Sequence, residues 1–205
     1  MTLLSKSEQK QVATAIADVE QETDAELVTV LAASSDDYAY IPLLWAGILA
    51  LLVPGAVNFF TGWFGVSGLV MAQWSTFIVL CLLFRFSGAS HRLVPRTVRF
   101  WRASNMARRQ FLEQDLHHTV GGTGMLIFVS EAEHYVEILV DQGISGQIDN
   151  QVWEGIVADF TSKVRQGRTL EGFVDCIQAC GTHLKAKVPA TREKNELPNH
   201  LIILE

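Results

Sequence analysis

Two carboxylates stand at the ends of predicted strands, where they could bind a metal ion together. Glu26 opens a stretch rich in β-branched residues, and Asp141 closes a later one, just before the chain turns at Gly143. If these strands are neighbours in a sheet, both side chains converge at one edge of it. Carboxylate and backbone oxygens are the ligands that Ca²⁺ and Mg²⁺ prefer. The alternative is that Asp141 caps the turn and Glu26 pairs with a basic neighbour.

Further oxygen donors could complete such a site. Asp24 and the hydroxyl of Thr23 precede the first strand, and Asp149 follows the second one closely. Near the end of the chain, Asn195 and Glu196 could bind the folded domain or fasten the tail by capping backbone groups. We favour the fastening role for these two residues.

The histidines and the glycine run give weaker indications of a functional site than the carboxylates do. His117 and His118 are adjacent, so on a helix they point about 100° apart and are not expected to share a ligand face. His134 falls in a predicted hairpin turn. The run Gly121-Gly122-Thr123-Gly124 could present N–H groups to an anion. It precedes a strand and lacks a following Lys-Ser/Thr, so it is predicted to be a turn and not a phosphate-binding loop. The catalytic residues, if the protein is an enzyme, are not defined by these patterns.

The three cysteines do not describe a disulfide framework, because their number is odd. Cys81 lies in an apolar stretch, and Cys176 and Cys180 are four apart on a predicted helix. No second ligand pair accompanies them, as a structural zinc site would need. All three are predicted to be small buried residues.

A long uncharged block, Ile41 to Phe84, interrupts the polar sequence. Its length is about twice the ~20 residues that cross a bilayer as a helix. Turn signals at Pro54-Gly55 and Thr61–Gly65 divide the block. The pattern predicts a transmembrane helical hairpin, with one span from Ile41 to Phe60 and the other from Val66 to Phe86.

Arginines follow the hairpin without an intervening acid: Arg85, Arg92, Arg96, Arg99, Arg102, Arg108 and Arg109. Such a run beside a span indicates the cytoplasmic side. Two spans then place both termini in the cytoplasm, in the cell inner (plasma) membrane. We expect Arg85, Arg92, Arg96 and Arg99 to meet anionic lipid headgroups. Phe100 and Trp101 within the run raise nucleic-acid binding as an alternative, but the flanking chain is acidic, so no nucleic acid is expected. The polar start of the chain predicts no signal peptide.

The remaining sequence predicts one α/β domain that the hairpin interrupts. Residues 1–40 supply a helix (5–22) and a strand (26–33), and residues 87–190 supply the rest of the domain. In that second part we expect helices and strands in this order: helix 98–118, antiparallel strands 125–129 and 135–140, and helices 150–166 and 170–187. The insert is residues 41–86, and residues 191–205 form a tail with a possible edge strand at Leu201–Leu204. The strands must pair across the insertion.

The stretch from Thr123 to Ile144, TGMLIFVSEAEHYVEILVDQGI, resembles the central hairpin of TPM domains. Three further segments resemble the family in the same order: Glu20-x-x-Thr23-x-x-Glu26-Leu-Val, Trp153-x-x-Ile-Val and Asn195-Glu-Leu-Pro198. The resemblance implies a small α/β/α sandwich around a few-stranded mixed sheet. The family carries a phosphatase label, some members bind a divalent cation, and roles in assembly or repair of membrane complexes are prominent.

Together these features predict an integral membrane protein whose TPM-like domain is an interaction or assembly module of a membrane complex. Its partners would be membrane lipids and a membrane protein. The alternative function is a weak phosphatase that depends on a divalent metal, Ca²⁺ or Mg²⁺, held by Glu26 and Asp141. Whether the protein is an enzyme stays open on the sequence alone.

Overall fold

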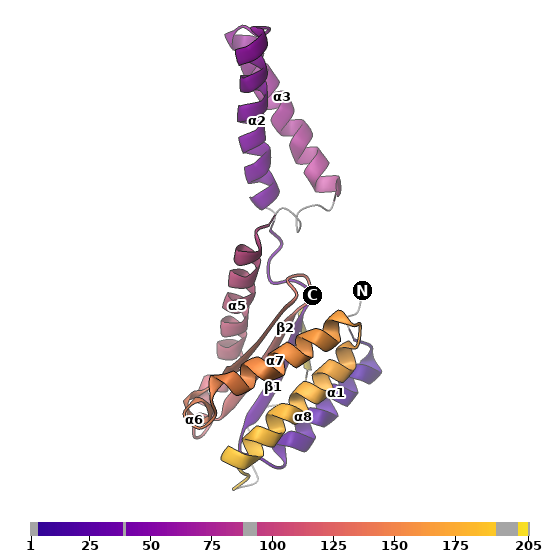
Figure 1. Cartoon of the computed structure of the whole chain (residues 1–205), viewed down its shortest axis with the longest axis vertical. Helices are drawn as coiled ribbons and strands as arrows, with labels where there is room; N and C mark the ends of the chain where they lie inside the picture. Colours follow the sequence, from indigo (N-terminus) through magenta and orange to yellow (C-terminus); the bar gives the residue numbers. More distant parts are fainter. Residues whose placement is uncertain (1–3, 39, 88–93, 192–200, 205) are drawn as a thin grey trace. The chain divides into compact units, whose positions relative to one another are not determined.

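A computed structural model describes residues 4–38, 40–87, 94–191 and 201–204, with the side chains of residues 85–87 excepted. The chain forms two compact units (Figure 1). The sheet unit comprises residues 1–35 and 100–205, and the hairpin unit comprises residues 36–99. The chain therefore leaves the sheet unit after its first strand and returns to it after the apolar helices.

A four-stranded mixed sheet with the order β3-β2-β1-β4 is the centre of the sheet unit. The strands are β1 (Glu26–Ala32), β2 (Gly124–Ser130), β3 (Tyr135–Val140) and β4 (Leu201–Leu204). β1 is parallel to β2 and to β4, whereas β2 and β3 form an antiparallel pair. Every residue of β2 is buried, as its almost wholly apolar sequence favours for an inner strand covered on both faces. Pairing of β1 with β2 joins segments on opposite sides of the inserted helices.

Helices cover both faces of the sheet, which confirms the predicted α/β/α fold (Figure 1). One face packs against α1 (Lys6–Glu20), α7 (Asn150–Arg165) and α8 (Thr169–Lys187). Alternate strand residues, among them Leu27 and Ile127, enter the core on this side. Trp153 of α7 is buried in the same core, with 4% of its surface exposed. The period of two along each strand therefore sends neighbouring side chains to opposite layers.

The other face packs against α5 (Arg96–Glu113). Val28, Leu126 and Phe128 contact this helix through its small residues Ala103 and Ala107. The predicted helix over residues 98–118 is wrong at its end, because α5 stops at Glu113. A short 3₁₀ helix, η1 (Leu116–His118), follows it. Leu116 is fully buried in the core on this face, and that contact holds the end of the segment against the sheet.

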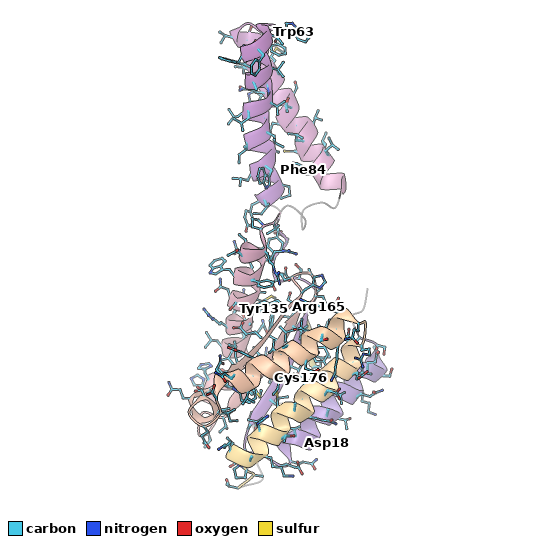
Figure 2. The ribbon with its side chains drawn as sticks, in the orientation of Figure 1. Asp18, Trp63, Phe84, Tyr135, Arg165 and Cys176 are labelled. Atoms are coloured by element: carbon cyan, nitrogen blue, oxygen red, sulfur yellow. The ribbon has the colours of Figure 1, made fainter. Side chains whose placement is uncertain are left out.

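Two helices of 22 residues each, α2 (Tyr40–Thr61) and α3 (Val66–Ser87), contact each other in the hairpin unit. Small residues of α2, including Ala46 and Ala50, are buried. The turn between the helices contains Gly62, whose φ of 65° suits glycine, and Trp63 (Figure 2). The Phe64 N–H donates to the Asn58 Oδ1 atom (2.8 Å) and closes the turn.

Candidate functional site

Glu26 and Asp141 flank Gly124 at one end of the sheet. Glu26 begins β1 and is in register with Gly124, the first residue of β2. On the other side, the Asp141 N–H donates to the Gly124 carbonyl oxygen (2.9 Å). The condition that β1 and β3 be neighbours is not met, because β2 lies between them. The two carboxylates are thus separated by one strand.

The backbone of Leu116 lies directly over Gly124. A Cβ atom at Gly124 would lie 2.0 Å from the Leu116 carbonyl oxygen, so only glycine fits there. The carbonyl therefore covers the residue that separates Glu26 from Asp141. Carboxylate and carbonyl oxygens are a hard donor set, and in donor type they fit Ca²⁺ or Mg²⁺.

Asp141 also caps a helix, as the alternative interpretation of the sequence expected. Its Oδ1 atom accepts a hydrogen bond from the Gln142 N–H (2.7 Å) at the start of α6 (Gln142–Ser145). The Oδ2 atom lies beside the glycine turn, where a Cβ on Gly122 would be 3.4 Å from it. Glu26 is buried, with 4% of its surface exposed. One oxygen of Asp141 thus has a structural role, and the other lies beside the turn.

The other predicted oxygen donors fasten the fold. The Thr23 hydroxyl donates to the Val188 carbonyl oxygen. Asp24 accepts hydrogen bonds from the N–H (3.0 Å) and the hydroxyl of Thr191. Asp149 is the N-cap of α7. Thr23 and Asp24 therefore hold the segment that follows α8, and Asp149 caps the start of α7. Two further candidates lie outside the described residues: Asn195 and Glu196.

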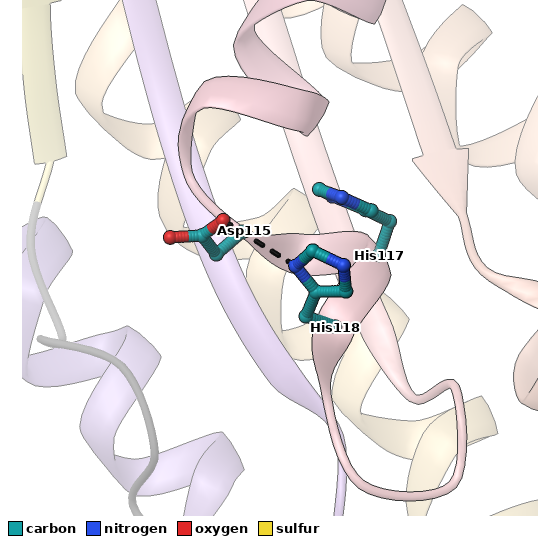
Figure 3. A group of neighbouring side chains, drawn as sticks. All are labelled: Asp115, His117 and His118. Atoms are coloured by element: carbon teal, nitrogen blue, oxygen red, sulfur yellow. Dashed lines mark ion pairs between the residues drawn. The ribbon is translucent and has the colours of Figure 1, made fainter.

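A second group of metal-ligating side chains lies between α5 and β2 (Figure 3). One ligand atom from each of Asp115, His117 and His118 is within 4.8 Å of the others. The two imidazole ring centroids are 3.8 Å apart, and His118 Nδ1 is 3.6 Å from Asp115 Oδ1. The prediction that the histidines cannot share a ligand face is wrong, because the α-helix assumed for them ends at Glu113.

A buried carboxylate in the β2–β3 turn was not predicted. Glu133 is 2% exposed and accepts hydrogen bonds from the hydroxyls of Ser130 and Ser34 (3.3 Å) and from the Ser35 N–H (3.1 Å). Ser34 and Ser35 follow β1 and lead toward α2. Glu133 therefore fixes the segment through which the chain leaves the sheet unit. No local pattern announces this role, since two of its partners are about a hundred residues distant in sequence.

A surface hollow of about 380 Å³ lies in the sheet unit between the β2–β3 turn and the α7–α8 region. It is near the carboxyl end of β2, and in open α/β sheets ligands bind outside the carboxyl ends of the parallel strands. The lining is apolar with a few polar groups and includes Val129, His134, Tyr135, Thr161, Val164 and Arg165.

The cysteines of α8 are buried, as predicted. A side-chain hydrogen bond with Cys176, together with burial, raises the pKa of the Cys180 thiol well above its usual value. A reactive cysteine needs a lowered pKa, and the surroundings of Cys180 act in the opposite direction. Cys81 of α3 is only partly buried, and the prediction of burial is wrong for it within this chain.

Both α2 and α3 are long and apolar enough to cross a membrane. Their observed bounds differ by at most one residue from the predicted limits Ile41, Phe60, Val66 and Phe86. Of the arginines assigned to headgroups, Arg96 is exposed and Arg99 is partly buried on α5. Arg85 belongs to α3, and Arg92 lies outside the described residues. Their contact with lipid stays a prediction.

Comparison with known proteins supports the resemblance seen in the sequence. A family model described as the TPM domain matches residues 94–183. α1 and β1 lie outside the match, although β1 is an inner strand of the same sheet. The fold is similar to the NMR structure of the BA42 protein from the psychrophilic bacterium Bizionia argentinensis, with a TM-score of 0.62 and 18% identity. That alignment covers 98% of this chain and 95% of the other. No curated protein matches the sequence.

Proposed function

We propose that this TPM-domain protein is a two-pass protein of the cell inner (plasma) membrane, whose sheet unit is a cytoplasmic interaction module of a membrane complex. The single observation that carries the proposal is the exposure of apolar side chains on α2 and α3. Phe59 and Phe60 are each 84% exposed, and Val66 is 86% exposed. Soluble proteins rarely expose a continuous apolar surface of this extent, whereas a bilayer covers it.

Contacts inside the hairpin unit agree with a lipid environment. Ala46, Ala50 and Pro54 are buried on α2, while large residues such as Leu51 and Leu52 are exposed. Small residues at helix contacts and large ones outside are typical of membrane helices, because lipid gives no hydrophobic reward for burying leucine between helices.

The arginine run supports a cytoplasmic position for the sheet unit. Positive residues next to a span are retained on the cytoplasmic side. Anionic headgroups of that leaflet attract each of them by about 1 kcal/mol. The arginine-bearing segment and the sheet unit would then lie on the same side of the membrane as both termini.

An interaction module needs a surface for its partner, and the hollow beside Arg165 is the surface we propose. It combines an apolar lining with an exposed guanidinium, and it lies at the end of the sheet that ligands favour in α/β folds. The Glu133 hydrogen bonds fix the chain at the same β2–β3 turn. A partner bound there would contact the β2–β3 turn, whose Glu133 accepts hydrogen bonds from the segment that leads toward α2.

Labelling with a membrane-impermeant maleimide tests the topology. In the variant Thr61→Cys the thiol stands at the last residue of α2, next to the turn between the spans, and we expect labelling on intact cells. In Glu113→Cys the thiol stands in the sheet unit, and we expect labelling only after lysis. The matched control is the chain without the added cysteine: Cys176 and Cys180 are buried, and Cys81, which is only partly buried, is replaced by serine in every chain compared. The reverse pattern would overturn the orientation, and recovery of the chain in the soluble fraction would overturn the membrane proposal.

Site-specific photo-crosslinking tests the interaction role. A photoreactive residue replaces Arg165 in the hollow or, as a control, the exposed Thr182 of α8. We expect the first variant to form an adduct with one membrane protein, and the second to form none. Equal adducts from both positions, or none from either, would contradict an interaction surface at the hollow.

A second function, a phosphatase dependent on a divalent cation, is favoured by the oxygen donors around Gly124. Glu26, Asp141 and the Leu116 carbonyl would hold the cation. A bound cation would supply Lewis-acid polarisation of a phosphoryl oxygen. In this proposal the protein residues position the cation at the end of the sheet and keep it beside solvent.

Calorimetric titration of Ca²⁺ and Mg²⁺ into the detergent-purified chain tests this second function. The matched variant is Asp141→Asn, since asparagine also caps helices and removes only the charge. Binding that Asp141→Asn loses, together with hydrolysis of phosphate esters that a chelator stops, would support the phosphatase. Binding without hydrolysis would leave a structural cation site, and no binding would remove this function.

A further inference from the structure

A cluster of nitrogen and oxygen ligands lies on either side of Leu116 in the chain, and it shares no side chain with the oxygen donors around Gly124. We propose that Asp115, His117 and His118 form a binding site for a late first-row divalent metal, with Zn²⁺ as the candidate. The three side chains supply two imidazoles and one carboxylate, and one ligand atom of each is already within 4.8 Å of the others (Figure 3). This proposal does not depend on membrane insertion or on phosphatase activity.

Local backbone geometry creates the cluster. Asp115 takes the left-handed conformation, with φ 54° and ψ 20°, and this residue separates α5 from η1. A non-glycine residue with this conformation is uncommon, and aspartate is one of the side chains that tolerate it. The change of direction brings the Asp115 carboxylate to the His118 ring, at 3.6 Å from Nδ1.

Packing holds the backbone that carries these ligands. Leu116, between Asp115 and His117, is fully buried in the core, and its carbonyl lies against Gly124. The Thr123 N–H donates to the Thr119 hydroxyl (2.9 Å), which fixes the segment after η1. The ligand-bearing residues are exposed, with 72% of the His118 side chain and 70% of the Asp115 side chain accessible. A fixed backbone with accessible donors reduces the conformational entropy lost when a metal binds.

The donor set selects the class of metal. Imidazole and carboxylate suit Zn²⁺ and its neighbours in the first transition row, whereas Ca²⁺ and Mg²⁺ prefer oxygen alone. In a tetrahedral Zn²⁺ site the ligand atoms stand roughly 3.4 Å apart, given Zn–N and Zn–O bonds of about 2.0–2.2 Å. The 3.6 Å pair is close to this value, and rotation of the exposed side chains would close the rest. Three protein ligands leave a fourth position for water or another molecule.

Zinc titration of the full chain in detergent tests the proposal. The chain is purified with an affinity tag that contains no histidine, and Zn²⁺ binding is followed by calorimetry. Replacement by Co²⁺ gives an absorption spectrum that reports tetrahedral coordination. We expect one Zn²⁺ per chain and a loss in affinity of at least about tenfold in His117→Ala, His118→Ala and Asp115→Asn. Asparagine keeps the left-handed conformation at position 115, so this variant changes only the ligand.

A matched control separates this site from any exposed histidine. His183→Ala removes an exposed imidazole from α8, and it should leave Zn²⁺ affinity unchanged. Thermal unfolding by circular dichroism should give the same midpoint for all variants without metal, because the three ligands are on the surface. An equal loss in His183→Ala, unchanged affinity in the His117→Ala/His118→Ala double variant, or no saturable binding by the parent chain would each overturn the site.

Discussion

In the sheet unit, Ile127 and Phe128 are completely buried, whereas in the hairpin unit Phe59 and Phe60 expose 84% of their surfaces. The side chains are of the same apolar kind in both units. In the first, they fill two layers between a sheet and its helices. In the second, they surround two helices whose mutual contact uses small residues. Apolar character alone therefore does not define a core, and the bilayer that we propose around the hairpin unit would account for the difference.

Polar groups differ between the units in the same way. The sheet unit buries Glu26, Thr29 and Glu133, and it contains ion pairs such as Lys163 with Asp159 and Asp175. Along the apolar helices, the Thr61 and Thr76 hydroxyls donate to carbonyl oxygens four residues earlier in the same helix, those of Val57 (2.7 Å) and Ala72 (2.8 Å). Backbone groups must be satisfied inside the segment when no water surrounds it.

The largest effect is expected at a tryptophan buried in the sheet unit, and a tryptophan exposed in the hairpin unit serves as its comparison. Trp153→Ala leaves a cavity in the core and should lower the free energy of unfolding by about 3–5 kcal/mol. Trp74→Ala, at a residue 64% exposed on α3, should change it little. Urea unfolding in detergent, followed by far-ultraviolet circular dichroism, measures both. Equal losses in the free energy of unfolding for the two variants would contradict the difference in packing between the units.

Trp153→Phe separates the packing of the ring from the effect of the indole N–H. The Trp153 Nε1 atom is buried without a hydrogen-bond partner in the described part of the chain. Phenylalanine keeps most of the ring and removes this unpaired donor, so part of the packing loss is offset. The variant should therefore be much more stable than Trp153→Ala, and similar losses for the two would show that the indole N–H has an important partner.

A charge distinguishes the two environments of exposed apolar residues. Ile78 in α3 is 54% exposed and Leu112 in α5 is 56% exposed, so water would accept arginine equally at both. In a bilayer, arginine near the middle of a span costs about 2.5–3.5 kcal/mol. We expect Ile78→Arg to reduce the fraction of chain that resists alkaline carbonate extraction from membranes, and Leu112→Arg to leave it unchanged. Unchanged extraction of both would contradict lipid around α3.

Two glycines of the sheet unit differ in the space available for a Cβ atom, and replacement by alanine should have opposite effects at the two positions. Gly124→Ala would place a Cβ 2.0 Å from the Leu116 carbonyl oxygen, so η1 must move, at roughly 1–3 kcal/mol. Gly155 of α7 has open space around its Cβ position, and Gly155→Ala should stabilise the helix by about 0.5–1 kcal/mol. Urea unfolding gives both signs. A stable Gly124→Ala variant would show that η1 is not held against the sheet.

Features set by local patterns could be predicted from the sequence. The absence of charge and the glycine turn define α2 and α3 to within a residue. β3 and β4 have the predicted bounds, because alternation and chain turns are also local. The apolar run of β2 favours an inner strand, but the pairing of β2 with β1 joins distant segments, and no local pattern gives the order β3-β2-β1-β4.

The candidate sites depended on contacts that no local pattern contains. Asp115, His117 and His118 come together because α5 ends at Glu113, and that end follows from the packing of Leu116 on Gly124. Helix periodicity continued past this point, so the prediction extended the helix and separated the histidines. Glu133 was missed for a similar reason, since its serine partners meet it only in the folded chain.

The smallest effect concerns Tyr135, a residue that is half-buried and so lies between the fully buried and the exposed side chains compared above. Burial, chiefly, raises the pKa of Tyr135 to about 12, with the nearby Glu137 charge also acting in this direction. The folded chain therefore favours the neutral phenol, whose ordinary pKa is about 10. This contribution to stability is complete below pH 10 and is lost as the pH rises toward 12. Solvent screens a half-exposed group, so the loss should be modest.

Tyr135→Phe removes the titrating group and tests this sign. Urea unfolding of the parent chain should show a free energy that falls as the pH is raised above about 10, and the variant should show a shallower fall. A difference between the two chains that is constant with pH would instead report lost hydrogen bonds of the hydroxyl. Only a difference in free energy of unfolding that changes above pH 10 identifies burial of the phenol. The pH series therefore distinguishes a half-buried tyrosine from one that is fully solvated.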